Sequence, residues 1–297
     1  MTFNHEDYQD IYPFAPHYFT HKSGLKQHYV DEGQGEPIVM VHGNPSWSFL
    51  YRDMIKTFRG GYRCIAPDHT GCGLSDKPRL DGFGYTLREH VDNLEALIES
   101  LQLSQPINLV VHDWGGAIGM GYATRHPEKI KRMTILNTGA FRLPKGCPFP
   151  WPIWLFRNTQ LGACLNQTFN AFSFIASHTC SLKGMSQKVR HGFRAPYDSP
   201  ANRIATTRFV QDIPLVPSDP SYVELVHIEE NLHKLADRPA LICFGRLDFV
   251  FTRHFYNEWK RHFPKATARS FHAGHYILED VGSEVFALMR ELLESRS

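Results

Sequence analysis

Short apolar runs alternate along the chain with longer stretches in which apolar residues recur at helical spacing. The apolar runs are bounded by turn residues and predict strands at residues 37–42, 62–67, 106–111, 130–136, 239–244 and 267–271, of which those at 37–42 and 106–111 should be buried. Residues 25–31 alternate between apolar and polar and predict one more strand. The helical patterns fall between them, at about residues 47–58, 87–101, 117–125, 254–262 and 283–294. This alternation is typical of an α/β protein whose mostly parallel central sheet is flanked by helices on both faces.

One of these helices has a well-marked start. Thr86 is followed three residues later by Glu89, which is the spacing of a capping box. In a capping box the two side chains satisfy backbone N–H groups that the first helical turn leaves free. We therefore expect the helix to begin directly after Thr86.

The strand–helix alternation stops after Gly139. From about residue 140 to residue 226 there is no buried-strand pattern, and prolines separate short helical patches and clustered aromatic residues. The alternation then resumes at residue 239. The sequence predicts an α/β core formed by residues 1–139 and 227–297, with a helical cap formed by residues 140–226.

Composition and charge argue against some classes of binding partner and cofactor. The net charge is +2, which gives no electrostatic reason to expect nucleic acid or an anionic membrane surface. No N-terminal basic segment leads into an apolar one, and no apolar run reaches the length of a bilayer span, so the cytoplasm is the expected compartment. The six cysteines follow no metal or disulfide spacing. We expect them to be buried free thiols, and we expect neither a metal nor an organic cofactor.

The stretch from residue 106 to residue 117 carries the strongest chemical signal. A buried strand passes into a helix with no room for a loop, and Asp113 lies at the turn, followed by Gly115 and Gly116. A turn of this kind is the nucleophile elbow, which usually reads G-x-S-x-G. Here an aspartate replaces the serine, which predicts a carboxylate nucleophile that forms an ester with its substrate. The alternative is a helix N-cap, which would not explain the flanking strand and the glycine pair.

A carboxylate nucleophile needs a base or proton carrier and an acid that orients it. His275 follows the last strand, and we prefer it to His272, which lies at the end of that strand. Asp248 follows the preceding strand and should reach the His275 ring; the alternative is a turn residue before a helix. The other position for an acid holds Asn137, whose amide cannot supply a negative charge. The order nucleophile, acid, histidine is the order expected of this fold.

Negative charge that develops on the substrate during the reaction needs hydrogen-bond donors to stabilise it. The backbone N–H of Trp114 and one from the turn at residues 43–45 are predicted to form an oxyanion hole, and the side chains of Asn44 and Trp114 can also point at an anion. The alternative for Trp114 is a plain core residue. His42 and His112 end buried strands, and we expect both to be structural.

Together these motifs carry a resemblance that covers nearly the whole chain. It resembles the haloalkane-dehalogenase branch of the α/β-hydrolase superfamily at residues 42–45, 68–75, 111–116 and 274–280. The resemblance implies that Asn44 and Trp114 hold the leaving halide. Asp248, with Asn137 at the alternative acid position, matches the subgroup that uses Asp-His-Asp with Asn plus Trp.

Within that branch, residues 68–78, 195–199 and 203–214 look most like the β-lactone decarboxylases of bacterial long-chain olefin biosynthesis. The resemblance implies conversion of a cis-β-lactone with two alkyl chains into a cis-alkene and CO2, beside other enzymes of an olefin pathway. Hydrolysis of a haloalkane is the alternative. An epoxide hydrolase would need two cap tyrosines, for which Tyr197 and Tyr222 are the candidates. A catalytically silent assembly component is disfavoured by the intact set of Asp113, His275 and Asp248.

The predicted cap is unusually rich in aromatic side chains. The aromatic run at residues 149–156 could form a membrane-surface patch, but packing over a pocket is preferred. Part of the cap's aromatic residues should line an apolar channel for alkyl chains. The residues leave open the chain length, the carbon that Asp113 attacks and the oligomeric state. The candidate channel residues are Trp151, Trp154, Phe156, Phe169, Phe172 and Phe174.

Overall fold

The computed structural model describes residues 4–295, which form one eight-stranded sheet with the order β1-β2-β4-β3-β5-β6-β7-β8. The pairs from β4 onward are parallel, whereas β2 pairs antiparallel with both β1 and β4. The prediction of a mostly parallel sheet is confirmed. The strands are β1 (His17–Thr20), β2 (Lys26–Glu32), β3 (Glu36–Val41), β4 (Tyr62–Pro67), β5 (Ile107–Asp113), β6 (Ile130–Thr138), β7 (Ala240–Gly245) and β8 (Thr267–Phe271).

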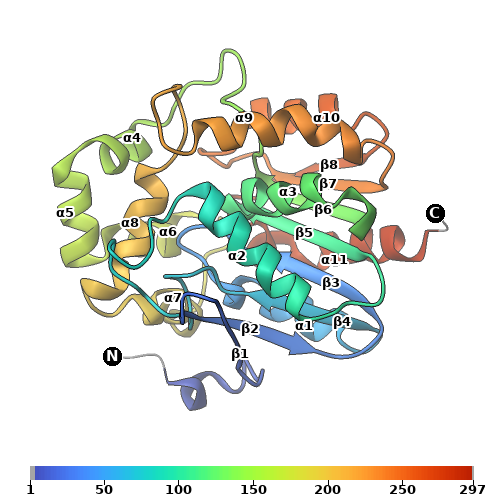
Figure 1. Cartoon of the computed structure of the whole chain (residues 1–297), viewed down its shortest axis with the longest axis horizontal. Helices are drawn as coiled ribbons and strands as arrows, with labels where there is room; N and C mark the ends of the chain where they lie inside the picture. Colours follow the sequence, from blue (N-terminus) through green and yellow to red (C-terminus); the bar gives the residue numbers. More distant parts are fainter. Residues whose placement is uncertain (1–3, 296–297) are drawn as a thin grey trace.

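Helices cover both faces of the sheet (Figure 1). One face packs against α1 (Arg52–Phe58) and α11 (Ile277–Glu294). The other packs against α2 (Leu87–Ser100), α3 (Trp114–Arg125), α9 (Tyr222–Asn231) and α10 (Arg253–His262). Parallel strands of this kind are buried on both sides, which explains why they read as continuous apolar runs.

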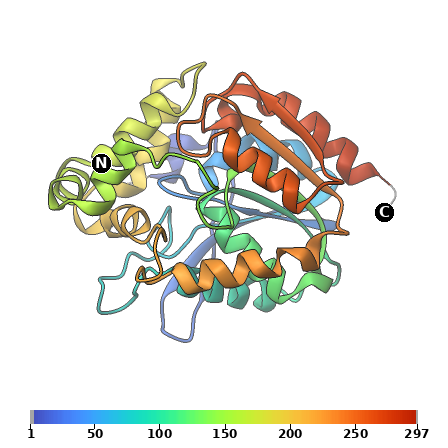
Figure 2. The ribbon, with the colours of Figure 1, turned by 90° about the horizontal axis from the view of Figure 1, so that it is seen from above.

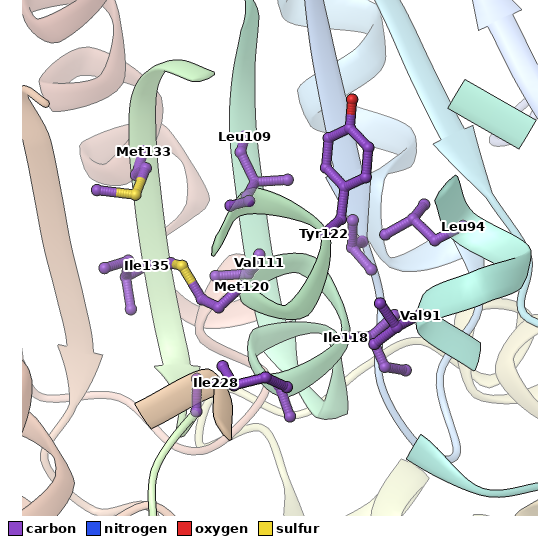
Figure 3. Close-up of a cluster of buried hydrophobic side chains, with 14 of the residues drawn as sticks. Val91, Leu94, Leu109, Val111, Ile118, Met120, Tyr122, Met133, Ile135 and Ile228 are labelled. Carbon is purple, nitrogen blue, oxygen red and sulfur yellow. The ribbon is translucent and has the colours of Figure 1, made fainter. Parts of the chain in front are cut away.

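Helix α3 is the centre of the larger core cluster. Figure 3 shows Ile118 and Tyr122 of α3 beside Val91 and Leu94 of α2, while Met120 faces the strands. The start of α2 is as predicted, because Thr86 and Glu89 form a reciprocal capping box. This packing holds the first turn of α3, and with it the end of β5, in a fixed place.

The segment between β6 and β7 is helical, and among residues 4–295 it contains no strand. The helices before α9 gather at one end of the sheet, on the left of Figure 1 and Figure 2. Helix α9 crosses residue 226, the predicted end of the cap, and packs on α2 and α3 of the core. The division into core and cap stays a prediction. The helices before α9 are α4 (Trp151–Asn158), α5 (Gln160–Phe169), α6 (Ala171–Thr179), α7 (Gln187–Arg194) and α8 (Ile204–Gln211).

The structure differs from the predicted elements in three places. Strand β1 was not predicted; it is an edge strand with mostly exposed side chains, so it lacks an apolar pattern. Helix α11 begins at Ile277 and not near residue 283, with a non-helical residue at Val281. All six cysteines are free as expected, but Cys164 is exposed.

None of the helices within residues 4–295 combines the length and the apolar character needed to cross a bilayer.

Candidate active site

Asp113 occupies a tight turn between β5 and α3. Its φ of 53° and ψ of −128° lie in a region that non-glycine residues seldom adopt, as expected of a nucleophile elbow. Neighbouring glycines allow the close approach: a Cβ at Gly115 would lie 1.9 Å from the carbonyl oxygen of Val41, and one at Gly43 would lie 2.0 Å from Asp113 Oδ1. The Asp113 side chain makes no capping hydrogen bond, so the N-cap alternative is wrong.

The Asp113 carboxylate is buried and held at both oxygens. Oδ1 accepts a hydrogen bond of 2.6 Å from the backbone N–H of Asn44, and Oδ2 lies 3.5 Å from His275 Nε2. The backbone N–H from the turn at residues 43–45, predicted to hold an oxyanion of the substrate, therefore holds the nucleophile itself. This contact fixes which way the carboxylate faces before any substrate arrives.

His275 and Asp248 come together as the sequence suggested. His275 Nδ1 donates to Asp248 Oδ2 at 2.8 Å, and both side chains are buried, whereas His272 is exposed. Asp248 also accepts from Asn137 Nδ2 at 2.8 Å and from the Val250 N–H at 2.7 Å. The sequence excludes Asn137 as the acid, but its amide donates a hydrogen bond to the acid, Asp248. The two residues meet because β6 and β7 are neighbours in the sheet.

The two carboxylates set the charge of the histidine. Burial lowers the pKa of His275, but Asp248 and Asp113 outweigh burial and raise it to about 10. Burial raises the pKa of Asp248, and the His275 ring more than compensates and holds it below its usual value. The resting site therefore contains an imidazolium ring between two carboxylates at neutral pH.

The neighbouring histidines have structural partners. His42 Nδ1 lies 2.7 Å from the carbonyl oxygen of Gly43, and His112 Nε2 donates to the carbonyl oxygen of His275 at 2.8 Å. Burial lowers the pKa of His112 to about 4, so this ring is neutral and helps to hold the His275 backbone. This agrees with the structural role expected of both.

Asn44 and Trp114 line the same cavity as Asp113 and His275. Asn44 Nδ2 donates to the carbonyl oxygen of Thr206 at 3.2 Å, while its buried Oδ1 has no hydrogen-bond partner within residues 4–295. The Trp114 ring is half-buried at the cavity wall. Two side chains with N–H donors thus lie at the end of the cavity that holds the carboxylate.

The rest of the cavity is almost entirely apolar. Besides the groups named above, its polar lining within the described part of the chain is limited to Thr179 and Cys180. An apolar cavity around a carboxylate and an imidazolium strengthens their electrostatic interactions and suits a substrate with long alkyl groups. The cap contributes Phe149, Ile153, Phe156, Phe172, Ile175 and Val210.

Phe156 and Phe172 line the cavity, but the prediction for Trp151, Trp154 and Phe169 is wrong. Their side chains are 75%, 52% and 70% exposed and do not contribute to the lining. On α4, at about 100° per residue, Ile153 and Phe156 face the cavity and the two tryptophans point the other way.

Phe169, at the end of α5, and Phe174 border a separate surface depression.

The tyrosines considered for an epoxide hydrolase lie elsewhere. Tyr197 is buried and donates to the carbonyl oxygen of Ser46 at 3.3 Å, and neither it nor Tyr222 lines the cavity. No pair of tyrosine hydroxyl groups within residues 4–295 is therefore placed beside Asp113 to protonate an epoxide oxygen.

Comparison with known proteins agrees with this geometry. Residues 36–280 match the family model described as the alpha/beta hydrolase fold. The chain is 52% identical to a cis-3-alkyl-4-alkyloxetan-2-one decarboxylase of Shewanella oneidensis, over 95% of this chain and 89% of that protein. It is 34% identical to a haloalkane dehalogenase of Mycobacterium marinum, over 92% of each chain. A solved structure, a variant of the haloalkane dehalogenase DatA from Agrobacterium tumefaciens, has a TM-score of 0.85 at 23% identity, covering 98% of this chain and all of the other.

Proposed function

The chain belongs to the α/β-hydrolase fold family, and from this premise we propose that it converts cis-3,4-dialkyl β-lactones into cis-alkenes and CO2. The observation that carries the choice of reaction is the 52% identity to a cis-3-alkyl-4-alkyloxetan-2-one decarboxylase over nearly the whole chain, against 34% to a haloalkane dehalogenase. The apolar cavity with Asp113, His275 and Asp248 at one end supports this substrate class.

In the proposed first step, the Asp113 carboxylate attacks the ring carbon that bears the lactone oxygen. A C–O bond to Asp113 forms, the ring C–O bond breaks, and its electron pair stays on the released carboxylate of the substrate. Asn44 and Trp114, at the same end of the cavity, stabilise that carboxylate with their N–H groups. Attack on saturated carbon inverts its configuration.

In the second step the substrate carboxylate leaves as CO2. The electrons of its C–C bond form the double bond, and the ester bond to Asp113 breaks and restores the aspartate. An anti elimination after the inversion gives a cis-alkene from a cis-lactone, with no water or proton consumed. The His275 imidazolium, 3.5 Å from Asp113 Oδ2, stabilises Asp113 as it leaves, and Asp248 keeps that ring charged and oriented.

Product analysis tests the proposal. A cis-3,4-dialkyl β-lactone should give alkene with a kcat/KM at least about a hundredfold above that for any 1-haloalkane, a difference of about 2.7 kcal/mol in transition-state stabilisation. Alkene is measured by gas chromatography and halide by release into solution on one preparation, with Asp113→Ala as the blank.

Efficient halide release without alkene would replace this proposal with haloalkane hydrolysis, which Asn44 and Trp114 also fit. Relatives of the chain act on apolar small molecules. We propose in addition that other olefin-pathway enzymes are its partners and that it works in the cytoplasm.

A further inference from the structure

The mouth of the cavity is exposed and apolar. Three large apolar residues that line the cavity are also exposed: Leu143 by 37%, Ile175 by 44% and Phe249 by 41%. They come from the loop after β6, from α6 and from the loop after β7, so these three segments surround the opening. Adjoining parts of the chain expose further large apolar side chains: Trp151 and Trp154 on α4, Leu182 shortly after α6 and Leu247 in the loop after β7.

The chain segments that carry the mouth, and the helix that follows them, are rich in cations. Residues 140–197 and 246–253 contain nine lysines and arginines and one carboxylate, Asp248, which is buried against His275. Since the whole chain has a net charge of only +2, the rest of it is net negative. The near-neutral overall charge thus conceals an excess of cations in these segments, of which three pair with carboxylates from elsewhere in the chain.

Several of these cations form no ion pair with a carboxylate of the described residues. Arg142, Arg157 and Lys188 are bound to carboxylates. Four others are exposed and have no carboxylate within 4.0 Å among residues 4–295: Lys145, Lys183, Arg246 and Arg253. Each lies within two residues of an exposed apolar side chain or of a cavity-lining one, so cations and apolar groups alternate along the rim.

We propose that the mouth of the cavity docks on a bilayer that contains anionic phospholipid. Tryptophan and aliphatic side chains lie favourably at the boundary between headgroups and acyl chains, and lysine and arginine are attracted to anionic headgroups. A docked mouth opens onto the acyl region, so an apolar substrate enters the cavity without crossing water. This goes beyond the proposed reaction and does not depend on it.

The open mouth favours a bilayer over a protein as the occupant. A rigid protein surface that covered Leu143, Ile175 and Phe249 would close the route to Asp113, whereas lipid chains are fluid and leave it passable. The sequence raised a membrane-surface patch only as the less favoured alternative, because the net charge averages over regions of opposite sign.

Vesicle flotation of the full chain tests the proposal, with vesicles of phosphatidylcholine alone and of phosphatidylcholine and phosphatidylglycerol in equal parts. We expect binding to the anionic vesicles that weakens as salt rises. Each cation removed should weaken binding by roughly fivefold, and loss of the tryptophans should weaken it at any salt concentration. The rim variants are the combined Lys145→Glu, Lys183→Glu, Arg246→Glu and Arg253→Glu chain and the Trp151→Ser, Trp154→Ser chain.

A matched control chain changes the net charge by the same amount as the four-cation rim variant, at positions away from the rim. Its positions are also exposed and have no carboxylate within 4.0 Å in the described residues. Equal loss of binding in the rim and control chains, or no preference for anionic vesicles in the unaltered chain, would overturn the proposal. Flotation measures binding and needs no turnover, so the docking proposal can fail or succeed independently of the proposed reaction. The control combines Lys22→Glu, Arg79→Glu, Lys234→Glu and Arg290→Glu.

Discussion

Replacing Asp248 by asparagine removes one charge while keeping the shape of the side chain. The carboxylate now accepts from three donors: Oδ2 from His275 and Asn137, and Oδ1 from the Val250 N–H. An amide has only one oxygen, so its NH2 group must face at least one of these donors. We expect that buried mismatch to cost about 1–3 kcal/mol in the free energy of unfolding.

The same change acts on the charge of His275. Asp248 Oδ2 lies 2.8 Å from the ring, nearer than Asp113 Oδ2 at 3.5 Å. Two nearby carboxylates hold the pKa of His275 at about 10 against burial, and loss of an opposite charge at this distance typically lowers a pKa by about one to three pH units. The proposed reaction needs the imidazolium form. Alkene formation by the unaltered enzyme should therefore decline only as pH rises through about 10, and in Asp248→Asn it should decline at lower pH.

The rate itself should also fall. A misoriented or uncharged ring loses most of an electrostatic contribution that is typically worth about a hundredfold to a thousandfold in rate. The assay is single-turnover alkene formation from pH 6 upward, with folding checked at each pH by circular dichroism. A decline that stays near pH 10 in Asp248→Asn would refute an imidazolium role for His275.

Asp280 offers a matched control. It is buried and accepts hydrogen bonds from the backbone N–H groups of Gly274, Leu182 and Lys183 and from the Ser181 hydroxyl, but it does not touch the His275 ring. Asp280→Asn should therefore lower the free energy of unfolding as Asp248→Asn does. It should leave the pH at which the rate declines unchanged.

Three further outcomes follow from the site. In His275→Ala the release of Asp113 should slow, so intact-mass analysis should show the protein plus one complete lactone; normal turnover would contradict this. Within a substrate series, kcat/KM should rise by roughly fourfold per added CH2, about 0.8 kcal/mol each, until the cavity is filled; a flat series would argue against alkyl binding there. The raised pKa of His275 stabilises the fold fully below about pH 6.5, and this contribution is lost as pH rises through about 10. Urea unfolding should then show the unaltered chain losing stability relative to His275→Gln over that pH range, and parallel curves would count against the charged ring.

The sequence predicted most strands to within two residues because each is a local apolar run that ends at a turn. The elbow could be recognised for the same reason, since its strand, Asp113 and glycines are contiguous. Strand β1 could not be predicted, because its side chains are exposed and its only support is pairing with β2. The early start of α11 was missed because Val281 breaks the helical geometry between its two parts.

Contacts between distant segments were harder to predict. The positions of Asp248 and His275 after successive strands indicated that they meet, because β7 and β8 are neighbours. Asn137 was judged only on whether it could be the acid, and its contact with Asp248 appears only once β6 and β7 are paired. No composition or spacing signal marks an amide as the support of a buried acid.

The error over the tryptophans has a physical cause in helix α4. A helix that covers a core usually has one apolar stripe and one polar face, which tells the two sides apart. Helix α4 has large apolar residues on both sides: Ile153 and Phe156 face the cavity, and Trp151 and Trp154 are exposed. Periodicity cannot assign such a helix to one surface. If the mouth docks on a bilayer, each side of α4 has its own apolar environment: one side faces the substrate cavity and the other faces the lipid. The two apolar sides that made the sequence prediction wrong are therefore what a cap at a bilayer surface requires.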